Sequence, residues 1–543
     1  MANNGGGGKP GPALVVGVPL VLLAAAGFFA YNYLIKPAMQ EKAEDKRAEM
    51  LEGSTSTKKY ETMVRVAGDP WSGYSTFRGE PRLAQALAKQ DMGIEYIDKE
   101  EYYDQDKRMA ALAEGKLDLA LTTLDAFLQH GTKHKKDGLY PGVIIWNIDE
   151  SNGGDAIFLT KGRNSFDDVK ASDKVCYSTG TPSEHLWDFA SLSFANLGDN
   201  LRTDNGVVAK DCWDKLKAGA VQVAVLWQPF TAVAQEQGFP KVFATGGQAD
   251  DVIVDIVVAN RDFVIKQKDK IQMLASSYFQ TIEAYEKDKP AHGKFITADC
   301  GPDCGGKDAL GMAVLEGIDF LTYEENMCLW WGLCGKPSKM TVRIAKTGRL
   351  LVAKSKVAAN DLPEASTILN DSFLVGIKSE MTAKSRLAAE VAGEGTKVDT
   401  PTINASEKTY EYKAETAKEN TSANVGTLEL PSIYFASGSA KLDPNAQSVV
   451  DGIADRLRSF PALCVRVYGH TSSEGNAKSN KKLSEDRAQA IVNYLKSLDG
   501  IAFPSSRFDV RGFGPEQLIL KDGVEDPVAS RRTEFKLFNC GAQ

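Results

Sequence analysis

The segment ALVVGVPLVLLAAAGFFAYNYLI, residues 13–35, contains no charged residue over 23 positions. A helix rises about 1.5 Å per residue, so this segment would span about 35 Å, enough to cross a bilayer with some tilt. A cleaved signal peptide is the alternative, but the run is long for one and only Lys9 precedes it. We therefore expect one N-terminal transmembrane helix, with residues 1–12 disordered and residues 36–59 forming a charged stalk.

The eight cysteines indicate the compartment of the remaining chain. They fall into local groups, which predicts four disulfides formed in an oxidising environment. A zinc site is the alternative for the central C-x3-C and C-x5-C groups, but the second spacing is long for zinc and no histidine is nearby in sequence. The eight are Cys176, Cys212, Cys300, Cys304, Cys328, Cys334, Cys464 and Cys540. An exported C-terminal part places the N-terminus in the cytoplasm, with a single pass through the bacterial inner membrane.

Composition, and the linker expected at residues 393–427, divide the exported part into two domains of α/β class. The 543 residues are 43% hydrophobic with a net charge of -8, which suits folded domains and disfavours nucleic acid as a partner. Helical and strand patterns alternate beyond residue 60, and helical character continues to residue 392. Residues 393–427 have few large apolar side chains and are expected to be a linker. We therefore assign residues 60–392 to one domain and 428–543 to another.

The C-terminal domain shows the pattern of a small two-layer sandwich. Asp443 precedes Pro444 at the expected start of a helix, and Ser484 is expected to cap a second helix. The segments CVRVYGH and TEFKLF read as strands, and they place Cys464 and Cys540 on the charged faces of both strands. We expect a β-α-β-α-β order with a disulfide between these two cysteines.

Six stretches of the larger domain are similar, in their order, to a known class of proteins. In order they are MVRVAGDPWSGY, LAEGKLDLALTTLDAF, WNIDESNGGDAIF, STGTPSEHL, AGAVQVAVLWQPF and VIVDIVVANRDF. Their order and spacing resemble periplasmic solute-binding proteins of the nitrate, sulfonate and taurine class. The resemblance covers roughly residues 60–335, and it implies two α/β lobes joined by a hinge that close on a small ligand.

The STGTPSEHL turn is a candidate anion site, because backbone N–H groups and hydroxyls at the start of a helix can hold an anion; a plain capped helix is the alternative. Asp255 lies in an apolar run and needs a partner, which is either a structural hydrogen bond or a ligand amine. Asp149, Glu150 and Asp155 surround a glycine turn and are expected to be solvated. The candidate ligand-binding residues are Trp71, Tyr74, Asp125, Ser178, Thr179, Thr181, Trp227 and Asp255. The expected ligand is a small anion or zwitterion.

Motifs of catalysis are missing from the sequence. There is no G-x-S-x-G, no Walker loop and no evident pairing of a nucleophile with a base, and the five histidines are scattered. We therefore expect a binding protein rather than an enzyme, without a cofactor or a metal.

The C-terminal motifs IYFASGSAKL, GHTSSEGNAKSNKKLSEDRA, VRGFGPEQ and SRRTEF resemble the OmpA-like peptidoglycan-binding domain, which also occurs in MotB-type proteins. In that family an aspartate and an arginine clamp the diaminopimelate of a stem peptide. The motif carries the arginine to Arg487 and the aspartate to Ser472, whose hydroxyl cannot neutralise an ammonium. Glu474 is the candidate to supply the missing charge. The candidate wall-binding residues are Ser472, Glu474, Asn480, Arg487, Arg531 and Arg532.

Arg487 is expected in the first turn of its helix, where the helix dipole disfavours a cation and a ligand carboxylate would offset that cost. A salt bridge to Glu485 or Asp486 is the alternative. Together these features predict an inner-membrane-anchored envelope protein that displays a small-molecule-binding domain in the periplasm and tethers to peptidoglycan. The alternative is a structural or stator-B-like subunit, partnered by other membrane subunits, whose binding domain is only a scaffold. Residues 13–35 lack the acidic residue that an ion-driven stator needs.

Overall fold

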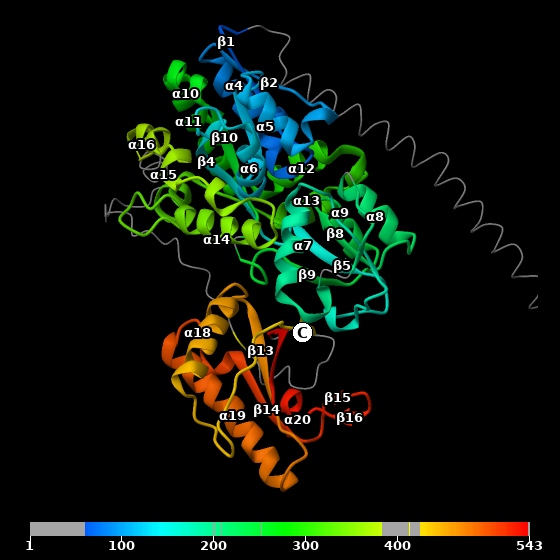
Figure 1. Cartoon of the computed structure of the whole chain (residues 1–543). Helices are drawn as coiled ribbons and strands as arrows, with labels where there is room; N and C mark the ends of the chain where they lie inside the picture. The colour runs from blue at the N-terminus through cyan, green and yellow to red at the C-terminus, as the bar shows by residue number, and fades with distance from the viewer. Residues whose placement is uncertain are drawn as a thin grey trace, which may run out of the picture.

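A computed structural model describes residues 60–198, 201–206, 208–250, 252–382, 412 and 424–540. The expected disordered N-terminus, transmembrane helix and stalk, together with most of the expected linker, lie outside these residues. Within the described part of the chain, no helix is long and apolar enough to cross a membrane. Figure 1 shows two α/β lobes and a C-terminal domain below them.

The first lobe is built on a mixed six-stranded sheet in the order β11-β4-β10-β3-β1-β2. Its central strands are mostly apolar and are buried along almost their whole length. The strands are β1 (Thr62–Ala67), β2 (Met92–Tyr96), β3 (Leu119–Thr123), β4 (Gly142–Ser151), β10 (Val254–Asn260) and β11 (Ile318–Phe320). The helices are α3 (Ser75–Gly79), α4 (Pro81–Ala88), α5 (Gln105–Ala113), α6 (Leu124–Gly131), α10 (Arg261–Lys266), α11 (Lys268–Glu286), α12 (Lys289–Cys300) and α13 (Asp308–Glu316).

The second lobe has a five-stranded sheet in the order β7-β6-β8-β5-β9. The strands are β5 (Asp155–Leu159), β6 (Lys174–Cys176), β7 (Arg202–Thr203), β8 (Val223–Trp227) and β9 (Lys241–Ala244). The helices are α7 (Pro182–Ser193), α8 (Ala209–Lys217) and α9 (Phe230–Glu236). The chain passes between the lobes twice, between β4 and β5 and between β9 and β10. The expectation of two α/β lobes with a hinge between them is therefore confirmed in its architecture.

A helical segment that follows the first lobe contacts both lobes. It contains α14 (Lys339–Ala353), α15 (Ala365–Ile368) and α16 (Ser372–Gly376), and its residues Phe373 and Leu374 are buried in the core of the first lobe. Just after α14, the Lys356 ammonium lies 2.5 Å from Glu184 and 3.3 Å from Asp188, both on α7 of the second lobe. This segment therefore links the two lobes outside the hinge.

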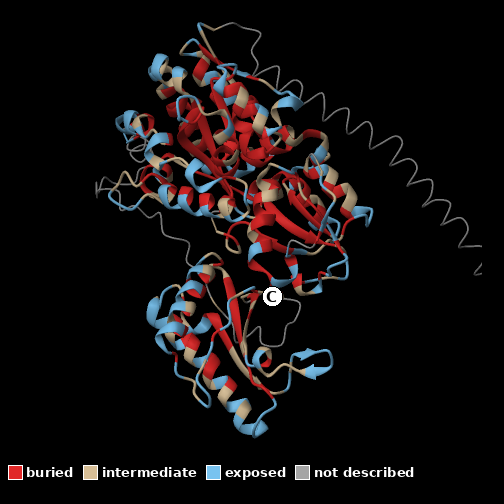
Figure 2. Ribbon diagram, in the orientation of Figure 1, coloured by how far each residue is buried: buried red, intermediate tan, exposed pale blue. Residues whose placement is uncertain are grey.

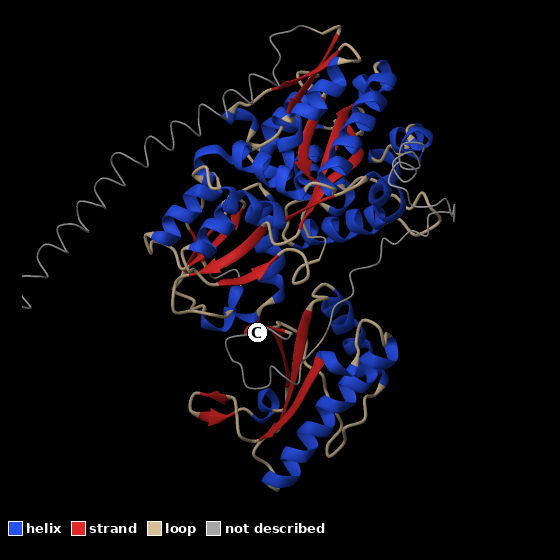
Figure 3. Ribbon diagram, turned by 180° about the vertical axis from the view of Figure 1, so that it is seen from behind, coloured by secondary structure: helices blue, strands red, loops and turns tan. Residues whose placement is uncertain are grey.

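The C-terminal domain is a sheet covered on one face by two long helices (Figure 3). The strand order is β12-β17-β13-β14. The strands are β12 (Asn424–Thr427), β13 (Leu463–His470), β14 (Phe508–Gly514) and β17 (Thr533–Asn539). The helices are α18 (Pro444–Arg458) and α19 (Ala477–Leu498), and a small excursion contains β15 (Leu520–Lys521), β16 (Val524–Glu525) and α20 (Pro527–Ser530).

Three local expectations for this domain are wrong. Helix α19 begins two turns before Ser484, because the Asn476 side chain accepts the Ser479 N–H at 3.0 Å and caps it there. The Ser484 hydroxyl is buried and donates instead to the Lys481 carbonyl at 2.7 Å. Strand β14 was not expected as a strand. Strand β12 lies in the end of the expected linker, because pairing with β17 overrides its polar composition.

All eight cysteines form disulfides, as predicted. The pairs are Cys176–Cys212, Cys300–Cys304, Cys328–Cys334 and Cys464–Cys540. No free cysteine occurs among the residues that the structure describes.

The C-terminal domain packs directly on the second lobe. The ring of Phe460, which follows α18, lies 5.4 Å from Phe189, 5.8 Å from Phe194 and 6.1 Å from Phe243, between ring centroids. At the edge of this aromatic contact, the Glu429 N–H donates to the Ser193 carbonyl at 2.8 Å. Buried residues of the lobe and the domain belong to one hydrophobic cluster, and Figure 2 shows the buried segments within each unit in red. The two units therefore share one hydrophobic contact region.

Candidate functional sites

A cleft of about 930 Å³ lies between the two lobes. Six of the eight residues predicted to bind the ligand line it, whereas Asp125 and Ser178 are buried and lie outside its lining. The six are Trp71, Tyr74, Thr179, Thr181, Trp227 and Asp255. These residues come from segments more than 180 positions apart, which meet because the strand ends of both lobes face the cleft.

A pair of buried carboxyl groups lies at the floor of the cleft, where Asp255 lines the cleft and Asp149 lies on the neighbouring strand outside the lining. Asp149 and Asp255 lie opposite one another on β4 and β10, and both are at most 1% exposed. The Tyr74 hydroxyl donates to Asp255, and the Trp71 indole N–H lies 3.4 Å from Asp149 Oδ2. The other oxygens of the pair, Asp149 Oδ1 and Asp255 Oδ2, are buried and have no hydrogen-bond partner among the described residues. Burial raises the pKa of both groups, and repulsion from Asp149 raises the pKa of Asp255 further.

Asp155 extends this acidic floor into the hinge. Its carboxylate accepts the Ser151 hydroxyl at 2.7 Å, and the Ser151 hydroxyl also lies 2.8 Å from Thr245 Oγ1 on the second connection. Burial raises the pKa of Asp155 to about 7. The expectation that Asp149, Glu150 and Asp155 are solvated is wrong, because the adjoining strand pairs enclose all three.

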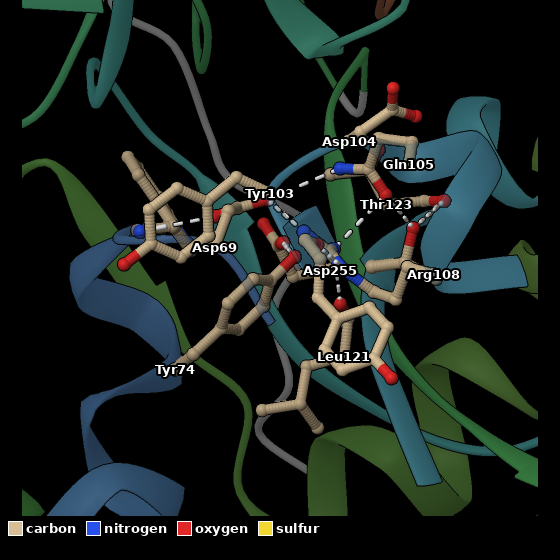
Figure 4. Close-up of polar contacts among 12 residues, drawn as sticks. Asp69, Tyr74, Tyr103, Asp104, Gln105, Arg108, Leu121, Thr123 and Asp255 are labelled. Atoms are coloured by element: carbon tan, nitrogen blue, oxygen red, sulfur yellow. Dashed lines mark hydrogen bonds and ion pairs between the residues drawn. The ribbon is translucent and has the colours of Figure 1, made fainter. Parts of the chain in front are cut away.

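Arg108 and Asp69 form a second polar network on the wall of the cleft (Figure 4). The Arg108 guanidinium lies 3.1 Å from Asp69 Oδ2, and it also donates to Gln105 at 3.0 Å and to the Leu121 carbonyl at 2.6 Å. Tyr103 stands beside this network at the cleft. Sequence reasoning did not identify these residues. Asp69 lies two residues after the end of β1, in the stretch MVRVAGDPWSGY, and an acidic residue at the end of a strand could have suggested a site residue. Arg108 has the sequence context of an ordinary helix residue.

The Ser178–Ser183 turn is occupied by the protein's own groups. The Gly180 N–H donates to Glu184 Oε2 at 2.7 Å, and the Thr181 hydroxyl donates to the Ser178 carbonyl at 2.7 Å. The Thr179 hydroxyl accepts the Asn205 amide at 2.7 Å. A carboxylate of this chain therefore takes one of the N–H groups expected to hold an anion.

The C-terminal domain places Arg487 without a carboxylate partner among the described residues. Its side chain is 8% exposed and donates to the carbonyls of Ser439 at 2.9 Å and Ala436 at 3.2 Å. Burial lowers the pKa of Arg487, and the nearby Arg531 guanidinium lowers it further. The expected position in the first helical turn is wrong, because α19 begins ten residues earlier and Arg487 lies in its middle. The alternative salt bridge does not form, and Asp486 pairs with Lys482 at 3.2 Å.

Ser472 and Glu474 lie beside Arg531. The Arg531 guanidinium lies 3.5 Å from the Ser472 hydroxyl and 3.4 Å from Glu474 Oε2. The Asn480 amide donates to the Glu474 carbonyl at 2.7 Å and so holds this loop against α19. Arg532 points elsewhere and donates to Glu534 at 2.7 Å. The structure thus gathers Ser472, Glu474 and Arg531 and leaves Arg532 in a structural ion pair.

No group of three or more His, Cys, Asp and Glu side chains is placed to hold a metal ion in the described part of the chain. The cleft therefore offers carboxyl groups, hydroxyl groups and aromatic rings to a ligand, and the C-terminal domain offers guanidinium groups.

Comparison with known proteins identifies the C-terminal domain. Residues 434–532 match the model of the OmpA family. The probable lipoprotein YiaD of Escherichia coli is 32% identical over 112 residues, which are 20% of this chain and 50% of that protein. The outer-membrane lipoprotein YfiB of Pseudomonas aeruginosa is 28% identical over 101 residues, 19% of this chain and 53% of that protein. The chain thus spans about half the length of these relatives.

Solved structures are similar to a larger share of the chain. The match to the periplasmic aliphatic sulphonate binding protein from Escherichia coli covers 55% of this chain and 97% of that protein. The two chains are 15% identical there, with a TM-score of 0.40. The match to the alkanesulfonate-binding protein from Xanthomonas axonopodis pv. citri, bound to MOPS, covers 57% of this chain and 98% of that protein, at 13% identity and a TM-score of 0.41. The peptidoglycan-associated lipoprotein from Burkholderia pseudomallei covers 20% and 87%, at 25% identity and a TM-score of 0.17.

Proposed function

We propose that this chain, which carries an OmpA-family domain at residues 434–532, is an inner-membrane-anchored envelope protein. Its C-terminal domain binds peptidoglycan, and its two lobes bind a small molecule in the periplasm. Four disulfides support this location, because disulfides persist in oxidising compartments. The apolar residues 13–35 support the membrane anchor.

The Arg487 guanidinium is the observation that carries the wall-binding part. It is nearly buried, it donates to two carbonyl oxygens and lies over the Phe435 ring at 5.2 Å, and a second guanidinium lies close to it. A cation in this setting gains most from a carboxylate, which can accept two parallel N–H bonds. The stem peptides of peptidoglycan supply such carboxylates. One relative, YfiB, is named as an outer-membrane lipoprotein, which supports a location in the cell envelope.

Binding to purified sacculi tests this part. The full-length protein in detergent should co-sediment with sacculi, and Arg487→Ala should weaken co-sedimentation by about 2–5 kcal/mol, because a charged contact is removed and a ligand carboxylate is left unpaired. Arg532→Ala is the matched control, because its guanidinium is already paired with Glu534. Equal loss in both variants, or undiminished binding by Arg487→Ala, would contradict the proposal.

A small-molecule role for the two lobes rests on the 930 Å³ cleft and on the six cleft-lining residues predicted from sequence. We propose binding without catalysis. A ligand that binds only the folded state raises the melting temperature, so a solute screen by thermal denaturation tests this role. The rival function, a structural subunit whose lobes are a scaffold, predicts no shift with any solute. The contact between Phe460 and the second lobe is the observation that favours this rival.

A further inference from the structure

The floor of the cleft is acidic and lacks basic partners among the described residues. Asp149, Asp155 and Asp255 are all at most 2% exposed, and their carboxyl groups contact hydroxyl groups and an indole. The Thr123 hydroxyl, opposite Asp255 on β3, is buried at the cleft and has no partner within the described chain. Burying ionised carboxylates without a cation is costly. This floor is therefore suited to a positively charged group from outside the chain.

The basic groups near the floor are already matched by acidic ones. Arg108 pairs with Asp69 at 3.1 Å, and Arg78 pairs with Asp299 at 2.5 Å. The Gly180 N–H, part of the turn expected to hold an anion, donates to Glu184. Three exposed lysines also line the cleft, and two of them are paired: Lys133 with Asp106 at 3.3 Å and Lys210 with Asp214 at 2.6 Å, whereas Lys107 is the third. An anion at the buried floor itself would meet several carboxyl groups. The electrostatics of the floor thus disfavour an anion.

Aromatic side chains form the walls around this floor. Trp71, Tyr74, Tyr103 and Trp227 all line the cleft. Trp227 lies directly opposite Asp155 in the pairing of β5 with β8. The faces of aromatic rings attract cations, and most strongly those that have lost part of their hydration. Carboxyl groups below and rings at the sides together suit an ammonium group that carries alkyl substituents.

We propose that the cleft binds an organic cation or an amine-bearing zwitterion, whose ammonium group lies against Asp155 and the Asp149–Asp255 pair between the aromatic walls. This inference rests on the proposed small-molecule role and specifies its ligand. An ammonium group at the floor favours the fully ionised pair, so the proton that burial retains on Asp149 or Asp255 is released to solvent when the ligand binds. No bond forms or breaks other than this proton transfer.

Binding should therefore depend on pH in a defined direction. Burial raises the pKa of Asp155 to about 7 and also raises the pKa values of the Asp149–Asp255 pair, so the free floor retains protons near neutrality. A cation binds the ionised form, so affinity should rise between pH 6 and pH 8, by up to about tenfold per pH unit for each proton released. The titratable and charged groups that act on the floor are Tyr74, Tyr278, Asp69, Asp125, Asp319 and Arg108. Arg108 is the basic group of this set, and Asp69 pairs with it. The other basic residues that line the cleft are His130 and the exposed Lys107, Lys133 and Lys210.

Matched probes separate the charge of the ligand from its shape. Choline should bind the full-length protein in calorimetry, whereas its uncharged isostere 3,3-dimethylbutan-1-ol should bind at least about tenfold more weakly. Butylammonium should likewise bind, and butyrate should not. Repeating the choline titration in phosphate and in Tris at pH 7, two buffers with different ionisation enthalpies, should reveal net proton release.

Two isosteric variants test the floor itself. Asp255→Asn keeps an acceptor for the Tyr74 hydroxyl but removes one carboxylate of the Asp149–Asp255 pair. Asp155→Asn keeps an acceptor for the Ser151 hydroxyl. Each should weaken choline binding by about tenfold or more, and Asp255→Asn should also reduce proton release. Glu100→Gln, at the exposed rim of the cleft, is the control and should change affinity by less than about twofold. Either floor variant is informative alone if the other fails to fold.

The outcomes distinguish this inference from the function on which it rests. Binding of butyrate but not of butylammonium would overturn the cationic ligand and leave the small-molecule role intact. Binding of choline without proton release would contradict the expected loss of a proton from the Asp149–Asp255 pair. If no probe binds at millimolar concentration, this inference fails together with the small-molecule role, while co-sedimentation with sacculi still decides the wall-binding role.

Discussion

A single residue, Ser472, sets the balance of charge at the wall-binding site. By its resemblance to the OmpA-like motif it takes the place of an aspartate, and its hydroxyl lies 3.5 Å from the Arg531 guanidinium. The carboxylates beside Arg531 are Glu474, whose side chain is 73% exposed, and Glu525, which accepts the Ser473 N–H at 2.9 Å. The site is well suited to a ligand carboxylate and poorly suited to a ligand ammonium.

Restoring the aspartate should strengthen wall binding. Ser472→Asp adds a buried carboxylate that can pair with the ammonium of diaminopimelate, so we expect about tenfold tighter binding to sacculi. Ser448→Asp, an exposed change on α18 with the same added charge, should have no such effect. Glu474→Gln should weaken binding by at most about 1 kcal/mol, because exposed ion pairs contribute little. A large loss in Glu474→Gln would instead identify Glu474 as the missing carboxylate.

At the scale of elements, the segment after α14 ties the two lobes together. The Lys356 ammonium lies between Glu184 and Asp188, and all three side chains are at most 17% exposed. Burial, followed by repulsion from Glu184, raises the pKa of Asp188 to about 6 despite the lysine. One ammonium group, from the segment after α14, thus compensates the charges of two neighbouring carboxylates on α7.

Removing that cation should destabilise the protein in a pH-dependent way. Lys356→Met should lower the free energy of unfolding by about 1–3 kcal/mol at pH 8, the usual cost of a buried pair reduced for partial exposure. The loss should shrink toward pH 5. A raised carboxyl pKa means that ionisation penalises the folded state, and this penalty disappears as Asp188 is protonated. Urea denaturation at both pH values measures the effect, with the exposed Lys378→Met as control. A loss that does not vary with pH would contradict the role of Asp188.

At the scale of the whole molecule, the OmpA-family domain packs against the second lobe in the described part of the chain. Phe460 packs against three rings of the second lobe, and the Lys536 ammonium lies 3.2 Å from Asp167 of that lobe. The hinge beside Asp155 therefore separates the first lobe from a unit made of the second lobe and the OmpA-family domain. Closure of the cleft would move the first lobe relative to the wall.

Disrupting this contact should separate the domains without unfolding them. Phe189→Glu places a charge against Phe460 and Phe243, so we expect a larger radius of gyration in small-angle scattering of the detergent-solubilised protein. Binding to sacculi should persist, because the site around Arg487 is made within the C-terminal domain. Leu139→Glu, an exposed change on the first lobe, should alter neither property. An unchanged radius would show that the aromatic contact does not hold the two units together.

Much of the architecture could be predicted from local signals. Apolar runs such as VIVDIVV predict buried strands, the paired cysteines predict disulfides, and the motif around Arg487 predicts its domain. Long-range pairing lay beyond those signals. Ser484 carries the signature of a helix cap, yet the helix runs through it because Asn476 caps the earlier start. Strand β12 has the composition of a linker and becomes a strand through its partner β17.

The sequence by itself determined the class of each domain, the oxidising compartment and the residues that would face a cleft, because periodicity, cysteine spacing and motif order act within short stretches. Only the tertiary structure decided the charge of that cleft. Asp149, Asp155 and Asp255 read locally as a solvated turn and a lone buried acid, but β4, β5 and β10 bring them into one enclosed floor. The charge felt by a ligand sums over groups that are close in space, and the fold sets which groups those are.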